Sequence, residues 1–323
     1  MLKRTLKVAA VGAIIAGPVF AWEEGESYTI SVAGSAPNQS IYAVGVAHKQ
    51  IVENALPGVR LEILATQGGN ENIELIMAEQ AQMANANSIS AYSAYNGNFV
   101  FEGMQDQDVL GFFPGYTWEI GPVVLADSEF ETFRDLIGHS IALGPVGSGA
   151  EATVTSAMEA MGLSDDDFER VQRSSPAQAF NSLAAGQVDA VIWGTAHPAG
   201  IYLENQATQD LRFLTFTEED LSMVTEALPF YTVGSLRAGS YEGQDEAVSW
   251  IGGSTHFWVN ASVPDNLVKQ MVAAIWENRA QLESAHSSQQ FVDEELVRQQ
   301  ADLVPFHPGA QAYFEEAGIL PAE

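Results

Sequence analysis

Two kinds of hydrophobic pattern alternate along the chain. Short runs of β-branched and other apolar residues, the first at 28–33, predict buried strands. Segments with apolar side chains every three or four positions, the first at 40–56, predict helices. The alternation continues, with further strands expected at 60–65, 83–85, 121–126, 140–143, 169–173, 188–193 and 249–259, and further helices at 71–79, 130–137, 150–161, 175–185 and 264–282. This order of elements is typical of an α/β protein with open sheets.

The N-terminal segment has the pattern of a secretory signal. Lys3, Arg4 and Lys7 precede an apolar run over 8–20, and Ala21 supplies a small side chain before an expected cut at 21–22. The run is too short to span a bilayer, which takes roughly 20 residues. The alternative is a buried N-terminal helix. We expect residues 1–21 to be a signal peptide and the mature chain to be soluble and periplasmic.

The remaining length of about 300 residues suits two domains. We expect each to be a lobe with an open mixed sheet flanked by helices. The predicted division places a central lobe, 122–230, inside a lobe formed by both chain ends, 22–121 and 231–323.

The charge balance restricts the partners. The chain has 13 Lys and Arg against 42 Asp and Glu, and removal of the signal, which holds three of the basic residues, changes the net charge from −29 to −32. Such a molecule is repelled by nucleic acid and by anionic lipid, so neither is expected to bind. Only Lys49 and Lys269 remain as lysines. This composition suggests a surface adapted to strong brine, as in a halophile.

The residue inventory gives little support for an enzyme. The absence of cysteine removes disulfides, thiol nucleophiles and thiolate metal sites. The six histidines are scattered, so no metal site is predicted, and neither a cofactor motif nor a G-x-S-x-G elbow is present. A Ser-His-Asp group assembled in space stays open, with His197 as its best candidate, because His197 follows a buried strand.

Four polar or glycine-rich loops follow strands and precede helices, at 34–42, 66–72, 85–88 and 144–149. Ligands of open α/β sheets bind at this edge. The first three loops supply candidate ligand-binding groups at Ser35, Ser40, Tyr42, Thr66, Gly68, Asn70, Asn87 and Ser88. Each loop also has a simpler explanation, because Asn and Ser are common helix caps.

The loop at 144–149 has the sequence GPVGSG and opens a helix, so its backbone N–H groups and the helix N-terminus suit a carboxylate or phosphate. The candidates here are Val146, Gly147, Ser148 and Gly149. Ala150 and Glu151 follow, which excludes a Walker loop. A plain turn with glycines for packing is the alternative. Thr195 and His197, after the strand at 188–193, complete the candidate set.

With these segments in place, the chain resembles the TAXI family of solute receptors for TRAP transporters. The resemblance runs through six stretches in order: 34–42, 66–72, 136–149, 184–190 with 196–198, 238–245 and 305–310. It implies a two-lobed periplasmic binding protein of type II-like fold, without cofactor or chemistry. It also implies delivery of glutamate, 2-oxoglutarate or a related dicarboxylate to a fused TRAP membrane permease. The first loop departs from the family pattern at 35–39, which puts the exact solute in doubt.

No arginine lies within the four loops, so we expect backbone amides at 146–150 to hold the anion. Two other functions stay open: a periplasmic amino-acid receptor for an ATP-driven importer, and an exported hydrolase that uses His197 with a serine. The protein is taken to be a monomer.

Overall fold

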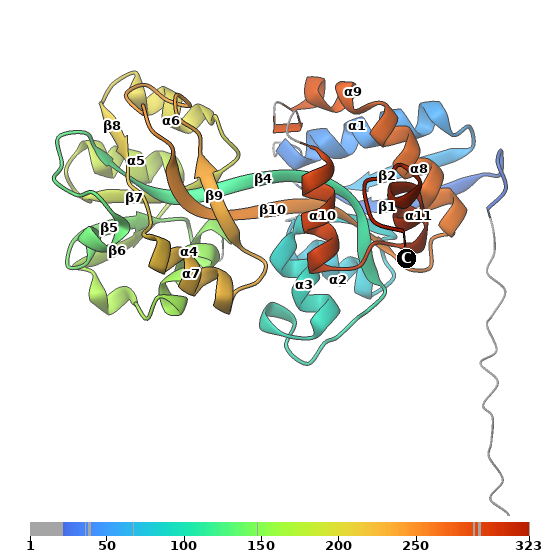
Figure 1. The fold of residues 1–323 in the computed structure, drawn as a ribbon, viewed down its shortest axis with the longest axis horizontal. Coiled ribbons are helices and arrows are strands. Elements are labelled where there is room, and N and C mark those ends of the chain that lie inside the picture. The colour runs from blue at the N-terminus through green and yellow to red at the C-terminus, as the bar shows by residue number, and fades with distance from the viewer. Residues whose placement is uncertain are drawn as a thin grey trace, which may run out of the picture.

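The computed structural model describes residues 22–35, 37, 40–66, 68–146, 148–286, 288–289 and 292–322. The expected signal peptide lies outside these residues. The chain forms two α/β halves joined by two long strands, β4 (Val109–Leu125) and β10 (Val248–Asn260) (Figure 1). In the described part of the chain, every helix is too short or too polar to cross a bilayer.

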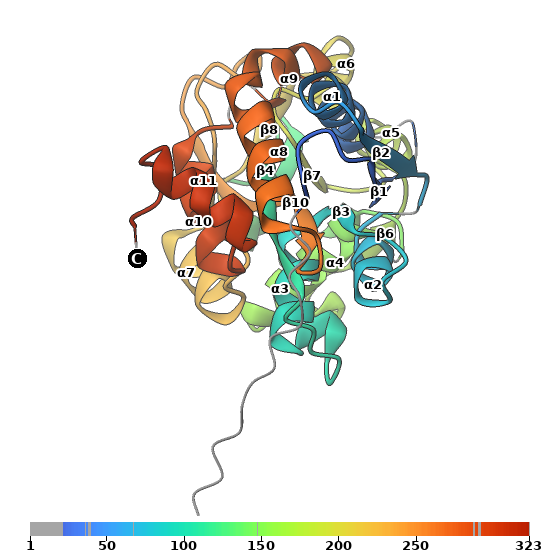
Figure 2. The same cartoon turned by 90° about the vertical axis from the view of Figure 1, so that its right-hand side faces the viewer.

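The first half is built from both ends of the chain. Its strands are β1 (Tyr28–Ala33), β2 (Val59–Leu64) and β3 (Met83–Asn87); β1 pairs in parallel with β2 and β3, and β10 joins β3 antiparallel. Its helices are α1 (Ser40–Ala55), α2 (Asn70–Met77), α3 (Ser88–Asn96), α8 (Asp265–Glu277), α9 (Arg279–Ala285), α10 (Glu294–Leu303) and α11 (Pro308–Glu316). Figure 2 looks onto this half, with α8, α10 and α11 nearest the viewer.

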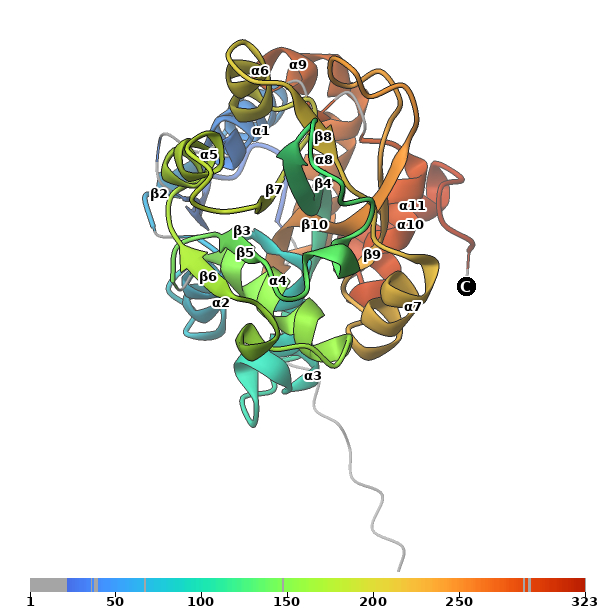
Figure 3. The ribbon, with the colours of Figure 1, turned by 90° about the vertical axis from the view of Figure 1, so that its left-hand side faces the viewer.

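The second half is built from the middle of the chain (Figure 3). Strands β5 (Ser140–Leu143), β6 (Arg170–Arg173) and β7 (Ala190–Thr195) run parallel, and β4 joins β7 antiparallel. Strand β8 (Leu211–Phe213) pairs with β4, and strand β9 (Thr232–Leu236) pairs with β10. The helices are α4 (Gly149–Ala160), α5 (Pro176–Ala184), α6 (Gly200–Gln206) and α7 (Glu218–Ala227).

Strands β4 and β10 pair antiparallel over most of their length, which makes the described strands one sheet in the order β2-β1-β3-β10-β4-β7-β5-β6. The register shifts between Thr255 and His256, opposite Gly115. A Cβ at Gly115 would lie 2.1 Å from the carbonyl oxygen of Thr255, so this irregularity requires glycine.

Separate hydrophobic cores stabilise the two halves. One cluster of buried side chains contains residues between Ile120 and Ile251, among them Leu236, Tyr241 and Trp250. Two other clusters, formed by residues between Trp22 and Phe113 together with those from Phe257 onward, fill the other half. The cores meet at β4 and β10, which places the space between the halves beside these two strands.

The predicted architecture of two α/β lobes with mixed sheets is confirmed, and β1 and β5 have the predicted bounds. The prediction of a single helix at 264–282 is wrong. The observed helix α8 ends at Glu277, because Asn278 leaves the helical conformation, and a second helix, α9, begins at Arg279. The helix expected at 130–137 is only a 3-10 turn at Phe133–Leu136. The strand expected at 121–126 is the end of the much longer β4.

Candidate ligand-binding site

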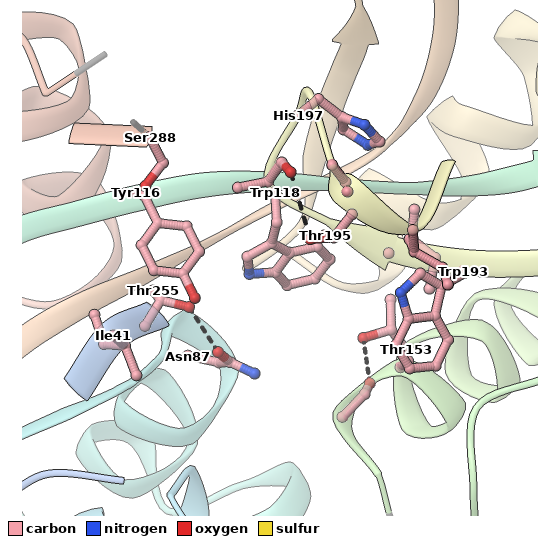
Figure 4. A pocket seen from close by; sticks show the side chains of 18 of the residues that line it. Ile41, Asn87, Tyr116, Trp118, Thr153, Trp193, Thr195, His197, Thr255 and Ser288 are labelled. Carbon is pink, nitrogen blue, oxygen red and sulfur yellow. Dashed lines mark hydrogen bonds between the residues drawn. The ribbon is translucent and has the colours of Figure 1, made fainter. Parts of the chain in front are cut away.

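A cavity of about 670 Å³ lies between the two halves, beside β4 and β10. Figure 4 shows it from close by. Its walls combine aromatic, aliphatic and neutral polar side chains. The lining residues are Ile41, Asn87, Tyr116, Trp118, Ile120, Ser148, Gly149, Ala150, Thr153, Trp193, Gly194, Thr195, Ala196, His197, Pro198, Ala199, Gly200, Ile201, Thr255, His286 and Ser288.

Strand β4 supplies one wall through alternate residues, Tyr116, Trp118 and Ile120, because side chains two positions apart share a face of a strand. A Cβ at Gly253, which pairs with Trp118 on β10, would lie 2.2 Å from the indole ring. The ring therefore occupies the space that the absent side chain leaves. The other side of this indole makes an edge contact with Tyr231, with ring centroids 6.1 Å apart.

The N-terminus of α4 supplies the opposite wall. Ser148 caps the helix by accepting a hydrogen bond from the N–H of Glu151, 3.2 Å away. The backbone N–H groups of Gly149 and Ala150 have no acceptor among the described residues. These two residues line the cavity, so their N–H groups are available to a ligand.

Asn87 of the first half lies directly across from α4. Its Oδ1 accepts a hydrogen bond from the Thr255 hydroxyl at 2.8 Å, an interaction that orients the amide (Figure 4). Its Nδ2 lies 3.5 Å from the position that a Cβ of Gly149 would occupy. The carboxamide nitrogen of one half therefore lies close to the N-terminus of α4 in the other half.

The end of β7 and the segment after it form a third wall, with Thr195 and His197 in the cavity. His197 Nδ1 lies 2.7 Å from Tyr241 Oη, and its Nε2 lies 3.4 Å from the carbonyl oxygen of Glu119. Burial lowers the pKa of His197 to about 4. Burial also lowers the pKa of His286. Neither ring is therefore a cation at neutral pH.

No Asp, Glu, Lys or Arg is among the residues that line the cavity in the described part of the chain. Arg173, at the end of β6, pairs with Glu151 at 2.9 Å and with Asp165 at 2.8 Å. Arg134 pairs with Asp220 at 2.6 Å. An anion in this cavity would meet N–H groups, hydroxyls and aromatic rings.

The structure brings five of the predicted site residues into the cavity: Asn87, Ser148, Gly149, Thr195 and His197. Gly147 lies outside the described residues, as does the side chain of Ser40. Ser35, Tyr42, Thr66, Gly68, Asn70, Ser88 and Val146 do not line the cavity.

Several of these outlying residues have structural contacts instead. Thr66 donates to Asn72 Oδ1, Asn70 Oδ1 accepts from Ser90, and Ser88 donates to the carbonyl of Ser254. The capping alternative is wrong for Asn87, which precedes α3 but makes no side-chain cap there.

The aromatic walls were missed by the sequence analysis. Tyr116 and Trp118 alternate within GYTWEIG, which is a strand pattern, but the flanking glycines and Pro114 obscured it. Trp193 lies at the end of a predicted strand and was not recognised as a contact. Thr255 reaches the cavity because β10 pairs with β3, which is far away in the chain, and no local pattern indicates such a pairing.

Comparison with solved structures places this architecture in a known class. A TctC solute binding protein from Polaromonas matches with a TM-score of 0.56, covering 88% of this chain and 98% of its own at 15% sequence identity. The periplasmic sulfonate-binding protein SsuA of a putative sulfonate ABC transporter from Methylobacillus flagellatus KT matches with a TM-score of 0.50, covering 92% and 89% at 14% identity. The fold is that of periplasmic solute-binding proteins. Residues 32–318 match the NMT1-like family, and the chain belongs to that family.

Proposed function

We propose that this protein is a periplasmic receptor of a transport system, which captures a small carboxylate-bearing solute between its lobes and delivers it to a membrane permease. The observation that carries the proposal is the cavity between two separately packed halves, where Asn87 of one half lies close to the N-terminus of α4 in the other. Ligand sites of two-lobed proteins lie at such domain interfaces. Binding there favours closure of the lobes, since the ligand contacts both.

The lobes divide within the two long strands in this proposal. Because Leu236, Tyr241 and Trp250 belong to the core of the second half, the return crossing lies near Ile251 on β10. The first crossing lies near Ile120 on β4. Lobe 2 then comprises about 120–251 instead of the expected 122–230, and β4 and β10 form the hinge.

A carboxylate is the proposed anchor group. The N–H groups of Gly149 and Ala150 and the Nδ2 of Asn87 would each donate to it, and the N-terminus of α4 favours negative charge. Hydrogen bonds to a charged partner contribute about 1.5–3 kcal/mol each. Three such bonds are compatible with micromolar binding, which corresponds to about 8 kcal/mol. The overall negative charge makes these local donors necessary, because no cationic side chain lines the described cavity.

The same lining weighs against two alternatives. An amino acid would bring an ammonium group, and no acidic side chain among the described lining residues could pair with it. Among the acids implied by the resemblance, 2-oxoglutarate therefore fits better than glutamate. A hydrolase would need His197 beside a serine, but its two nitrogens face Tyr241 and the carbonyl of Glu119.

Isothermal titration calorimetry of the purified protein tests the receptor function. The panel consists of aliphatic, keto and aromatic carboxylates, amino acids and alkylsulfonates. We expect stoichiometric binding of at least one carboxylate, recovered chemically unchanged, and no binding of amino acids. The proposal would be contradicted if no carboxylate gave a binding signal, or if a bound ligand were converted into product.

We further propose that the permease is of the ion-driven TRAP type, on the strength of the resemblance to TAXI receptors. Uptake assays in proteoliposomes that contain receptor and permease would separate this from an ATP-driven importer. A TRAP system would take up solute in response to an imposed sodium or proton gradient without ATP. Dependence on internal ATP would instead assign the receptor to an ABC importer.

A further inference from the structure

We propose that Trp118 and Trp193 select a solute whose body is flat and aromatic, so that the ligand is an aryl monocarboxylate. This inference rests on the receptor function proposed above and narrows its substrate class.

The indoles of Trp118 and Trp193 differ from three other tryptophans in how their N–H groups are used. Trp22, Trp250 and Trp258 donate to backbone carbonyls within 3.0 Å. In the described part of the chain, the N–H groups of Trp118 and Trp193 have no acceptor, although both side chains line the cavity. Both indoles are only half-buried, at the surface of the cavity. Among the described residues Trp276 also has no acceptor, but it lies outside this cavity. Trp118 and Trp193 present both a ring and a free donor to whatever occupies the cavity.

The aromatic rings are spread along the cavity and do not enclose one point. In Figure 4, Trp118 lies between Tyr116 and Trp193. None of these three rings is within contact distance of another, whereas Trp118 touches Tyr231. A cage for an ammonium group needs several rings around one centre. Separated rings provide a row of apolar surface, which suits an extended planar body.

The position of Trp118 is fixed before any ligand binds. Its ring occupies the space above Gly253 and has Tyr231 at its edge. Tyr231 is itself held by a hydrogen bond of 3.1 Å from its hydroxyl to Thr153 on α4. The indole is therefore held between the hinge and the helix whose N-terminus offers the carboxylate site, and little side-chain freedom is lost on binding.

The absence of charged side chains from the described lining argues against a second carboxylate. A dicarboxylate anchored at Gly149 and Asn87 would place its other charge against rings and aliphatic side chains, without a cationic partner. Burial of an unpaired charge is strongly unfavourable. The cavity of about 670 Å³ is also in the size range of pockets for larger organic ligands, roughly 300–1,000 Å³.

The first test measures, by calorimetry, the affinity of the unmodified protein for a set of ligands. The probes are benzoate, 3-phenylpropionate and indole-3-acetate, against hexanoate, succinate, 2-oxoglutarate and choline. We expect at least one aryl carboxylate to bind ten-fold or more tightly than hexanoate and 2-oxoglutarate. The variants Trp118→Leu and Trp193→Leu should then weaken the aryl acid at least ten-fold, while Trp276→Leu, the same change at a tryptophan outside the cavity, leaves its affinity unaltered.

Each other outcome overturns the inference in a recognisable way. Preference for 2-oxoglutarate or succinate would refute the aromatic class while leaving the receptor function intact. Tight binding of choline would indicate a cation site and refute both the carboxylate anchor and the aryl acid. Aryl binding unchanged in both variants would refute the role of the two indoles. Absence of binding by every carboxylate would refute this inference together with the proposed function.

Discussion

His197 Nδ1 and Tyr241 Oη lie 2.7 Å apart, and the same hydroxyl oxygen accepts a hydrogen bond from the N–H of Ala199 at 2.8 Å. Because Ala199 donates to the hydroxyl, the hydroxyl can donate its own proton to Nδ1. The proton of the neutral imidazole is then on Nε2, which faces the carbonyl of Glu119. His197 thereby ties the segment that walls the cavity to the loop after β9.

Replacement of Tyr241 by Phe should lower the free energy of unfolding by about 1–3 kcal/mol, because it leaves the Ala199 N–H and a His197 nitrogen without partners inside the protein. Urea denaturation followed by circular dichroism measures the change. Tyr95→Phe is the control, since the Tyr95 hydroxyl has no hydrogen bond among the described residues. Equal stability of the two variants would show that the Tyr241 contact contributes nothing.

His48 should destabilise the protein. It is buried between Phe113 and Phe257, and neither of its ring nitrogens has a hydrogen-bond partner among the described residues. We expect His48→Leu to raise the free energy of unfolding at pH 7 by about 1–3 kcal/mol, because it removes unsatisfied polar atoms from a core. A loss of stability at pH 7 would mean that the shape of the imidazole matters more than its polarity.

The same variant should change the pH dependence of stability. Burial lowers the pKa of His48 to about 3 from its usual value near 6.5. Between these values the unfolded chain binds a proton that the folded chain does not, so stability falls as the pH decreases below 6.5. His48→Leu removes this part of the slope, and its advantage should grow by roughly 2 kcal/mol between pH 7 and pH 5. Urea denaturation of the variant and of the unmodified protein at pH 5 and pH 7 measures the difference.

Asn87→Asp tests the carboxylate anchor with little change in shape. The substitution keeps an acceptor for Thr255 and replaces the Nδ2 donor with an anionic oxygen beside α4. We expect affinity for any bound carboxylate to fall at least 100-fold. Asn96→Asp, an exposed position at the far end of α3, adds the same charge and should alter affinity less than three-fold. Similar losses in both variants would indicate a general charge effect.

Gly253→Ala should disturb the hinge and the cavity together. The new methyl group would lie 2.2 Å from the indole of Trp118, so the ring must move. We expect stability to fall by about 1–3 kcal/mol and ligand affinity to fall with it. In Gly45→Ala the nearest atoms would be 3.8 Å away, and this change within α1 should be neutral or stabilising. Calorimetry measures the ligand affinity of both variants, and urea denaturation measures their stability. Equal values for the two variants would contradict the prediction.

The melting temperature should rise with salt. The chain without residues 1–21 has a net charge of −32, and self-repulsion opposes a compact state. At 1 M salt the Debye length is about 3 Å, which screens most of this repulsion. Scanning calorimetry from 0.05 to 2 M NaCl should show a steady increase. A melting temperature independent of NaCl would contradict the proposed adaptation to brine.

The sequence pattern correctly predicted those helices and strands whose formation depends on residues close to them in the chain. The strands β1 and β5 and the start of α4 follow from runs of apolar residues and from the GPVGSG turn, because strand propensity and helix capping act over a few positions. The loops containing Asn87 and Gly149 were predicted as strand-to-helix turns for the same reason. The loops at 34–42 and 66–72 have the same local chemistry, yet most of their predicted residues lie outside the cavity.

By itself the sequence determined the α/β class, the strong negative charge and the position of α4 with its free N–H groups. Tertiary structure alone decided the composition of the cavity. Trp118 faces it because β4 pairs with β10, more than a hundred residues away, and because Gly253 leaves room for the indole. Pairing between distant strands depends on the whole fold, so no local pattern could specify which aromatic side chains meet the carboxylate site.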